Sequence, residues 1–434
     1  MDIIKNFQIL KKEISNWVKN PYFGFVKGHD YLEEKQLHEI KSFVGENNYE
    51  VIRKFEKKFA KSIGLGNAIS YASARMGFYS LLDYLKIGEG DEVILTGFTC
   101  AVMSNAVWKV GAKPVFTDID PSNFGTCSIA IKDNITPKTK MIVAQHTFGI
   151  PCNIDKLVNI AKENNIFILE DCALTHGSSS YGKKIGSFGD ASLFSTDHSK
   201  PINSFMGGVI YTESEEIHYE LSINHKSIPH LSIQHQKKIW NKLLYERKYF
   251  QPTRYGKNGL ISILKKNILF EKNIYLDGDF EKESNHHYPY PASMPSFIAA
   301  LGLIEMDRWN NEIVKRRKTL DDYLMVANVC GLNEFLPYAY FDKDLDIVPL
   351  RFIYQHPLPN KIKERMSDFI DVDWFWFNQP LIGCKNINAH GYIKGSCIES
   401  EKASKNIINW PCIFSAKSNV YLFENLKDIY LNYW

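Results

Sequence analysis

The sequence contains no C-x-x-C pair and no uninterrupted apolar run of membrane-spanning length. Its eight cysteines are spread along the chain, which argues against a zinc site and a disulfide framework and favours a reduced cytoplasm. Residues 1–20 alternate apolar and charged side chains, so we expect no signal peptide there. We therefore expect a cytoplasmic protein without a membrane partner.

A strong charge of either sign is also lacking, since 52 Lys and Arg side chains face 49 Asp and Glu side chains, for a net charge of +3. Sequence-independent binding of nucleic acid needs a concentrated basic face. The densest basic cluster, residues 315–318, falls in a helical pattern and is expected to be a solvated helix face. We therefore expect no nucleic-acid partner.

The 434 residues are enough for two or three units with hydrophobic cores. Residues 1–50 are predicted to form a helical N-terminal arm. Residues 51–290 are predicted to form a large domain, with an insertion or lid-like segment at about 216–290 where the regular pattern weakens. Residues 291–434 are predicted to contain a bridging helix from Ser296 to about Asn328 and a small C-terminal α/β domain.

Strands and helices alternate within the large domain. Helices are predicted at Tyr49–Ile63, Ser73–Leu85, Ala101–Val110 and Ile154–Asn164, and strands at Ala68–Tyr71, Glu92–Leu95, Pro114–Asp118, Ile166–Glu170, Ala191–Ser195 and Gly207–Tyr211. Short buried strands that alternate with helices of about ten residues are typical of βαβ units. The pattern therefore predicts an α/β fold with a mostly parallel sheet covered on both faces.

Three groups of residues lie where predicted strands end, the edge at which open α/β sheets bind ligands. One buried strand ends in Glu170 and Asp171, which could also cap a helix or bind a metal. A second strand ends in Ser195 and leads into a polar loop with Lys200, and an isolated loop lysine is usually just solvated. At the third, Ser73 joins a strand to a helix N-terminus, which is either a tight turn or an anion site.

Together these groups contain what pyridoxal 5′-phosphate (PLP) requires of a protein. A lysine forms a Schiff base with the cofactor and then carries a proton during catalysis. A carboxylate beside the pyridine nitrogen keeps that nitrogen protonated, and a helix N-terminus with hydroxyl donors binds the phosphate. The combination predicts a PLP site, with Ser195 placed to supply one of the hydroxyls.

Longer motifs strengthen this interpretation. The chain carries KIGEGDEVILTGFTCAVMSNAVWKVGAKPVFTDIDP, then FILEDCALTHGSSSYGKKIGSFGDASLFS, and then SKPINSFMGGVIYT. Over about residues 51–212 and again at 294–325 it resembles the DegT/DnrJ/StrS sugar aminotransferases. The resemblance implies fold type I, with a mostly parallel seven-stranded sheet in a large PLP-binding domain and a smaller α/β C-terminal domain. It also implies a homodimer with shared active sites.

The resemblance assigns roles to individual residues. The Schiff-base lysine falls on Lys200, the aspartate that binds the pyridinium on Asp171, and a phosphate-binding serine on Ser195. The phosphate-binding turn falls on Ser73-Ala74-Arg75, where Arg75 replaces a threonine. Arg75 is expected either to pair with the phosphate or to point to solvent or to the partner chain.

Other positions depart from the family pattern. Cys100 stands where an aromatic ring commonly stacks on the cofactor, and Leu174 where Gln or His is frequent. The segment Pro291-Ala292-Ser293-Met294-Pro295 keeps only the methionine of a family Asn-Tyr-Arg-Met-Ser motif. His176 matches a common family histidine, which is expected either to support Asp171 or to be a satisfied core histidine.

The segment at 216–290 occupies the place of a shorter connection in the family, so it is expected to reshape the pocket. Tyr288, Tyr290 and His286 are predicted as lining residues.

The resemblance implies transfer of an amino group from an amino acid, with L-glutamate as the usual donor, to a keto sugar. The sugar is expected to be nucleotide-linked and to serve surface-polysaccharide or related amino-sugar biosynthesis. One alternative is a sugar dehydratase on the same fold; known dehydratases replace the lysine with histidine, so Lys200 speaks against this although His198 is near. A second alternative is a non-catalytic binding protein that kept the fold.

Overall fold

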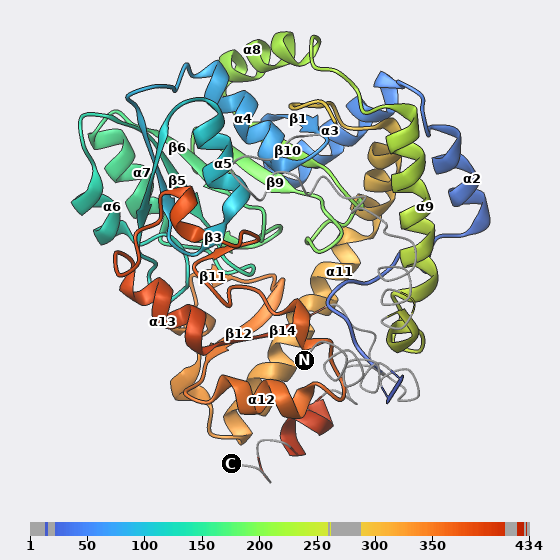
Figure 1. The fold of residues 1–434 in the computed structure, drawn as a ribbon, viewed down its shortest axis with the longest axis vertical. Helices are drawn as coiled ribbons and strands as arrows, with labels where there is room; N and C mark the ends of the chain where they lie inside the picture. The colour runs from blue at the N-terminus through green and yellow to red at the C-terminus, as the bar shows by residue number, and fades with distance from the viewer. Residues whose placement is uncertain are drawn as a thin grey trace.

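The computed structural model describes residues 14–15, 22–258, 261, 288–412, 423–428 and 431. A seven-stranded sheet forms the centre of the larger part of the molecule (Figure 1). Its strand order is β1 (Asn67–Tyr71), β10 (Gly208–Thr212), β9 (Ala191–Ser195), β6 (Phe167–Asp171), β5 (Thr139–Gln145), β2 (Glu92–Thr96) and β4 (Lys113–Thr117). β10 runs antiparallel to both of its neighbours, whereas the other six strands of this sheet all run in one direction, so the predicted mostly parallel α/β fold is confirmed.

Helices pack on this sheet because their apolar residues gather on one face. The helices that contact its strands include α3 (Tyr49–Ile63), α4 (Ala74–Tyr84), α5 (Ala101–Lys109) and α7 (Ile154–Glu163). In α3 the Asn48 side chain accepts a hydrogen bond from the Val51 N–H and so caps the helix start. Val51, Phe55 and Phe59 are buried at helical spacing, which docks α3 against the core.

Among the strands of the large sheet and the helices between them, two elements are not predicted by the sequence pattern. They are α6 (Ser128–Asn134) and the central strand β5, which lies between β6 and β2. The apolar run of β5 is short, and periodicity alone does not separate such a run from a buried helical segment. The predicted helices and strands in the rest of the sheet are found within two residues of their expected bounds.

Helix α11 (Ser296–Val329) connects this part of the chain to a second hydrophobic core. Its Phe297 and Leu301 pack into the core beneath the large sheet, whereas Leu320 and Tyr323 belong to the second core. The second core surrounds β12 (Arg351–Gln355), which pairs antiparallel with β14 (Ile407–Pro411) and is flanked by α12 (Pro359–Met366) and α13 (Ile398–Asn406). In Figure 1 β12 and β14 lie beneath the large sheet and beside α11.

The remaining strands are short and connect the two parts. β13 (Leu381–Ile382) pairs in parallel with β3 (Thr99–Cys100), and β11 (Leu345–Asp346) pairs with β7 (Ser179–Ser180), which in turn pairs with β8 (Lys183–Lys184). The C-terminal chain is thereby tied to loops at the edge of the large sheet.

Three further α-helices lie outside these groups. They are α2 (Glu34–Ser42), α8 (Glu215–His225) and α9 (Ile233–Tyr249), and the last two lie in the predicted insertion. Ahead of α2, Phe23 and Phe25 pack into the second core. Among the described residues, no helix is both long enough and apolar enough to cross a bilayer.

Candidate active site

A cavity of about 620 Å³ lies at the carboxyl ends of the sheet strands. It is lined by residues that follow β1, β2, β6 and β9, as well as by a segment from the C-terminal part of the chain. The predicted site residues that line it are Ser73, Ala74, Arg75, Cys100, Asp171, Ser195 and Lys200. The fold therefore gathers into one cavity residues that are up to 127 positions apart in the sequence, from Ser73 to Lys200.

Asp171 is the last residue of β6, which points its side chain into the cavity. The residue is 5% exposed, and its Oδ1 accepts a hydrogen bond from the Ala173 N–H at 2.9 Å. Burial raises the pKa of Asp171, although this hydrogen bond and the nearby Lys200 act in the opposite direction. A cationic partner inside the cavity would restore its negative charge.

Lys200 lies in the loop between β9 and β10 and faces both the sheet edge and the C-terminal segment. Its Nζ is 4.6 Å from the centre of the Trp376 ring. Burial lowers the pKa of Lys200, although attraction to Asp197, Cys100 and Asp171 raises it. More of this amine is therefore neutral and nucleophilic than in a solvated lysine.

The turn between β1 and α4 forms the opposite end of the cavity. Ser73 is extended (φ −154°, ψ 159°) and precedes the helix, whose first N–H groups have no partner within the helix. A Cβ on Gly208 would lie 2.1 Å from the backbone of Ala74, so the glycine lets β10 approach this turn closely.

This turn fits a phosphate group. The Ser73 hydroxyl is buried and has no hydrogen-bond partner among the described residues, and the Ser195 hydroxyl lines the same cavity. Hydroxyl donors and free N–H groups at a helix N-terminus are what a dianion needs. Together with the Lys200 amine and the Asp171 carboxylate, they provide a donor and acceptor set that suits PLP.

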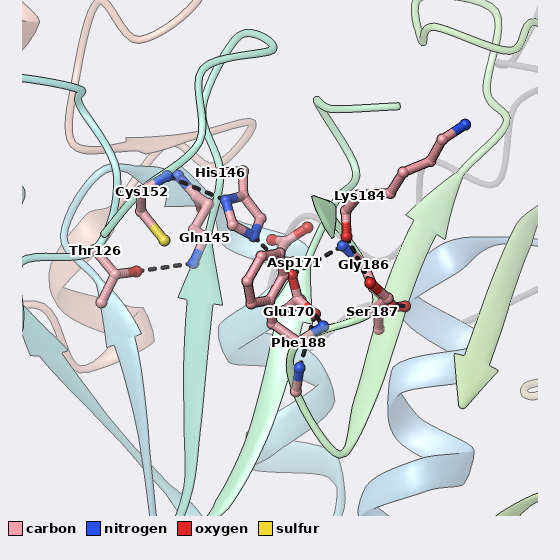
Figure 2. Close-up of polar contacts among 12 residues, drawn as sticks. Thr126, Gln145, His146, Cys152, Glu170, Asp171, Lys184, Gly186, Ser187 and Phe188 are labelled. Atoms are coloured by element: carbon pink, nitrogen blue, oxygen red, sulfur yellow. Dashed lines mark hydrogen bonds and ion pairs between the residues drawn. The ribbon is translucent and has the colours of Figure 1, made fainter. Parts of the chain in front are cut away.

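Glu170, the neighbour of Asp171, faces away from the cavity into a network of hydrogen bonds (Figure 2). Its Oε1 accepts from the N–H groups of Phe188 at 2.6 Å and Gly189 at 2.8 Å, and its Oε2 accepts from Gly186 at 2.9 Å. His146 Nε2 lies 3.2 Å from the same Oε2. The network ties the 186–189 loop, part of the motif GSFGD, to the end of β6.

His146, Glu170 and Cys172 place three atoms of metal-ligand type within 4.8 Å of one another. His146 Nδ1 accepts a hydrogen bond from the Cys152 N–H at 3.1 Å, so its Nε2 carries the proton that faces Glu170. Both ring nitrogens and both Glu170 oxygens are thus engaged in protein hydrogen bonds. This arrangement favours a structural role for the cluster.

His176 is not part of the cavity lining, in contrast to the role predicted for it near Asp171. Its ring packs against Phe59, Phe194 and Trp309, and its Nε2 lies 3.2 Å from Ser62 Oγ. Burial lowers the pKa of His176 to about 3, which keeps the ring neutral. This placement corresponds to the other reading of His176, a core histidine.

The prediction of lining residues from the 216–290 segment is wrong for the two tyrosines. Tyr290 packs against Tyr79, and its hydroxyl donates to the Arg75 carbonyl at 3.3 Å, while Tyr288 packs near His235. Neither tyrosine lines the cavity. His286 lies outside the described residues. The segment contributes Ile239 of α9 instead.

A C-terminal wall, which we define as residues 374–378, closes the cavity on the side facing Lys200 and was not predicted. It presents the aromatic side chains of Trp374, Phe375, Trp376 and Phe377. The run WFWF is visible in the sequence, but it has no strand or helix period that would place it opposite a sheet edge. These rings line the cavity, whereas Cys100, at the position where the family commonly has a stacking ring, offers no aromatic side chain.

Part of the chain is similar in sequence to curated proteins. GDP-perosamine synthase from Escherichia coli O157:H7 is 37% identical over 167 residues, which cover 38% of this chain and 46% of that protein. L-glutamine:2-deoxy-scyllo-inosose aminotransferase from Streptoalloteichus tenebrarius is 34% identical over 165 residues, 38% of this chain and 39% of that protein. The chain thus spans less than half the length of these curated relatives.

Solved structures and a family profile extend the likeness over most of the chain. Spr1654 from Streptococcus pneumoniae in its PLP form has a TM-score of 0.70 at 18% identity and covers 96% of this chain and 100% of that chain. At this identity the likeness shows the fold, which confirms the expected fold type I. A profile matches residues 32–415. The chain therefore belongs to the DegT/DnrJ/EryC1/StrS aminotransferase family.

Proposed function

We propose that this chain is a PLP-dependent aminotransferase that moves an amino group from an amino acid to a keto sugar. PLP is the cofactor that the family indicates and that the cavity residues fit. The observation that carries the proposal is one cavity lined by a buried lysine, a buried aspartate and a helix N-terminus with an unpartnered serine hydroxyl. No one of these features is diagnostic alone, but PLP chemistry needs all three.

Each group has a specific task. Asp171 would hold the protonated pyridine nitrogen, and Ser73, Ser195 and the N–H groups at the start of α4 would hold the phosphate. Arg75 lines the same end of the cavity and adds positive charge there. When bound, the cofactor withdraws electrons from the donor's α-carbon.

Lys200 would act as the catalytic base and acid. Burial lowers the pKa of its amine, so more of it is in the neutral form that accepts the α-proton than in a solvated lysine. The same Nζ would later return a proton to the acceptor carbon of the sugar. The aromatic residues of the C-terminal wall shield this amine from bulk water, which keeps the proton within the site.

The substrate proposal rests on the relatives. One is named for GDP-perosamine, a nucleotide-linked amino sugar, so we propose a nucleotide-linked keto sugar and a place in surface-polysaccharide or related amino-sugar biosynthesis. L-Glutamate remains the proposed donor, and L-glutamine is the second donor to test because another relative is named for it.

We also propose a homodimer with shared active sites, as the family resemblance implies, and a cytoplasmic location. The eight cysteines are all free, which suits a reducing compartment. We keep the division into an arm at 1–50, a PLP-binding domain at 51–290 and a C-terminal region at 291–434. Sedimentation of the purified protein tests the dimer.

The direct test replaces Lys200 with alanine. The wild type loaded with PLP should absorb near ~420 nm, and L-glutamate should bleach that band while one equivalent of 2-oxoglutarate forms. Lys200→Ala should lack the band and lose the donor half-reaction by at least ~10²–10⁴-fold. Lys132→Ala, an exposed lysine on α6, should behave as wild type. A Lys200→Ala protein that keeps both the band and the reaction contradicts the assignment.

A sugar dehydratase is the second candidate, because His198 lines the same cavity and its Nδ1 lies 2.8 Å from Asp197 Oδ1. The donor half-reaction separates the two functions. An aminotransferase releases 2-oxoglutarate and regains the ~420 nm band when a keto sugar is added. Loss of water from the sugar without amine transfer would favour the dehydratase.

A further inference from the structure

The amine of Lys200 lies over the face of an aromatic ring of the C-terminal wall. Its Nζ is 4.6 Å from the centre of the Trp376 ring, within the range of a cation–π contact. Among the residues that the structure describes, this Nζ makes no hydrogen bond and no ion pair with a carboxylate. A positive charge on the amine therefore meets the ring face and not a paired carboxylate.

Several charged or titratable groups surround Lys200 in the cavity. They are Asp197, His198, Cys100, Asp171, Arg75 and Arg351. The Oδ1 of Asp197 lies 2.8 Å from the Nδ1 of His198, and Asp171 is the proposed partner of the pyridine nitrogen. Burial raises the pKa of the Cys100 thiol, which keeps it neutral near pH 7. The acids are thus engaged elsewhere or neutral, which leaves the ring to stabilise a charge on Nζ.

The fold holds the ring of Trp376 at the cavity edge. The Trp376 N–H donates to Asn409 Oδ1 at 3.3 Å, and Asn409 Nδ2 donates to the Trp376 carbonyl at 3.1 Å. Asn409 belongs to β14 and is fully buried. The neighbours Phe375 and Phe377 are buried in the second core, whereas Trp376 is only partly buried. These contacts fix the position of the ring that Lys200 meets.

Arg351 makes the contact between amine and ring more important. Its guanidinium carbon lies 3.7 Å from the centre of the Trp376 ring, so the ring contacts two cationic side chains. Burial lowers the pKa of Lys200, and the positive charge of Arg351 lowers it further. The negative face of an indole ring offsets part of such a repulsion.

The reaction itself places a charge on this amine. As the α-proton is transferred, the Cα–H bond of the donor breaks, its electron pair stays with the α-carbon, and a new N–H bond forms at Lys200 Nζ. We propose that Trp376 is a further catalytic residue, whose ring face receives the Lys200 amine when it is not bonded to the cofactor and stabilises the charge that the α-proton brings. This inference rests on the proposed function and adds a second catalytic side chain to the same site.

The first test measures the charge of Lys200 in the full chain without cofactor. Trace acetylation by acetic anhydride modifies only the neutral amine, and mass spectrometry of the digested protein gives its extent at Lys200 as a function of pH. Trp376→Leu removes the ring face that stabilises the charged amine, so the pH midpoint of Lys200 labelling should fall by about 0.5–1 unit. Trp376→Phe keeps a ring face and should lower the midpoint less.

Three controls accompany the labelling. Lys132, exposed on α6, is an internal reference that should be labelled equally in every variant. Trp108→Leu, which changes a partly buried tryptophan of α5 outside the cavity, should leave the Lys200 midpoint within about 0.2 unit of wild type. A fluorinated tryptophan in place of Trp376 keeps the ring shape but withdraws electrons from its face, so it should also lower the midpoint. It decides the question if Trp376→Leu fails to fold.

The second test follows the donor half-reaction of the PLP-loaded protein by the loss of its ~420 nm band. A less basic amine accepts the α-proton more slowly, so Trp376→Leu should lower the maximal rate by ~3–30-fold. The half-saturating L-glutamate concentration should stay within about threefold of wild type, because the ring acts on the proton transfer and not on donor binding. Deuterium at the α-carbon of L-glutamate should slow Trp376→Leu by a larger factor than wild type.

The outcomes separate this inference from a structural role. A Lys200 midpoint that is the same in wild type, Trp376→Leu and the fluorinated protein overturns the proposal. A shifted midpoint with an unchanged half-reaction overturns it as well, since the ring would then stabilise the charge without affecting catalysis. If the proposed function fails, L-glutamate does not bleach the wild-type band. A labelling shift would then support the contact with Trp376, but its catalytic role would fall with the reaction.

Discussion

Two buried carboxylates that are neighbours on β6 lie in contrasting surroundings. Glu170 accepts three backbone N–H groups and faces His146, so the protein itself satisfies its oxygens (Figure 2). Asp171 accepts one backbone N–H and borders a cavity of about 620 Å³. Successive residues of a strand point to opposite faces of the sheet. Glu170 and Asp171 are one position apart, so their side chains meet these two different surroundings.

The comparison shows that burial and charge do not identify a functional carboxylate. Both side chains are buried, and the two residues end the same apolar strand. They differ in how many hydrogen bonds their oxygens can still accept from a ligand. Both oxygens of Glu170 are already engaged, whereas Asp171 accepts one N–H group and can accept more.

Removing the charge of Asp171 should have the largest effect on chemistry. Asp171→Asn keeps the hydrogen bond from Ala173 but cannot stabilise a protonated ring nitrogen, so the donor half-reaction should slow by ~10²–10³-fold. Denaturant unfolding should give a free energy no lower than that of wild type, because a buried charge is lost. Asp190→Asn, which alters a carboxylate outside the cavity, should leave the half-reaction rate near wild type in a stopped-flow measurement.

Removing the charge of Glu170 should have the opposite profile. Glu170→Gln turns an NH₂ group toward backbone donors, so the free energy of unfolding should fall by about 2–3 kcal/mol. The folded fraction should still react with L-glutamate at a rate within several-fold of wild type. Glu163→Gln, an exposed change at the end of α7, serves as the stability control. Equal losses of rate in Glu170→Gln and Asp171→Asn would end the distinction drawn between the two.

The sequence predicts the sheet side of the cavity well because its groups follow strands, and strand ends of a parallel sheet meet at one edge. Apolar runs predict six of the seven sheet strands, and the motif resemblance selects Asp171 and Lys200. The same reasoning could not place His176, since an aromatic pocket made by Phe59, Phe194 and Trp309 forms only in three dimensions.

The C-terminal side of the cavity is not predictable by these rules. The C-terminal wall comes from a segment with only a short 3-10 turn, and the element that orients it, β12, contacts it through Arg351. Nothing in the residue pattern around Arg351 distinguishes a buried, cavity-facing arginine from one at the surface. Its burial depends on packing between elements that are far apart in the sequence.

Asp197 is a third carboxylate for this comparison, and its partner His198 can itself titrate. Burial raises the pKa of Asp197, but the adjacent His198 lowers it to about 2. Burial lowers the pKa of His198, yet attraction to Asp197 and their hydrogen bond raise it to about 9.

The smallest predicted effect follows from this pair. The folded-state pKa of His198 lies above its unfolded value of about 6.5, so the charged pair stabilises the protein fully below that pH and loses its contribution as pH rises through 9. Wild type should exceed His198→Gln in unfolding free energy by about 1–2 kcal/mol at pH 6–7, and the difference should vanish by about pH 10. His225→Gln is the control, because burial lowers the pKa of His225, so its contribution should rise slightly as pH rises through about 6.5 and stay level above about pH 7.5, opposite in sign to that of His198. A difference between wild type and His198→Gln that stays constant from pH 6 to 10 would mean that titration of His198 does not govern the charge of Asp197.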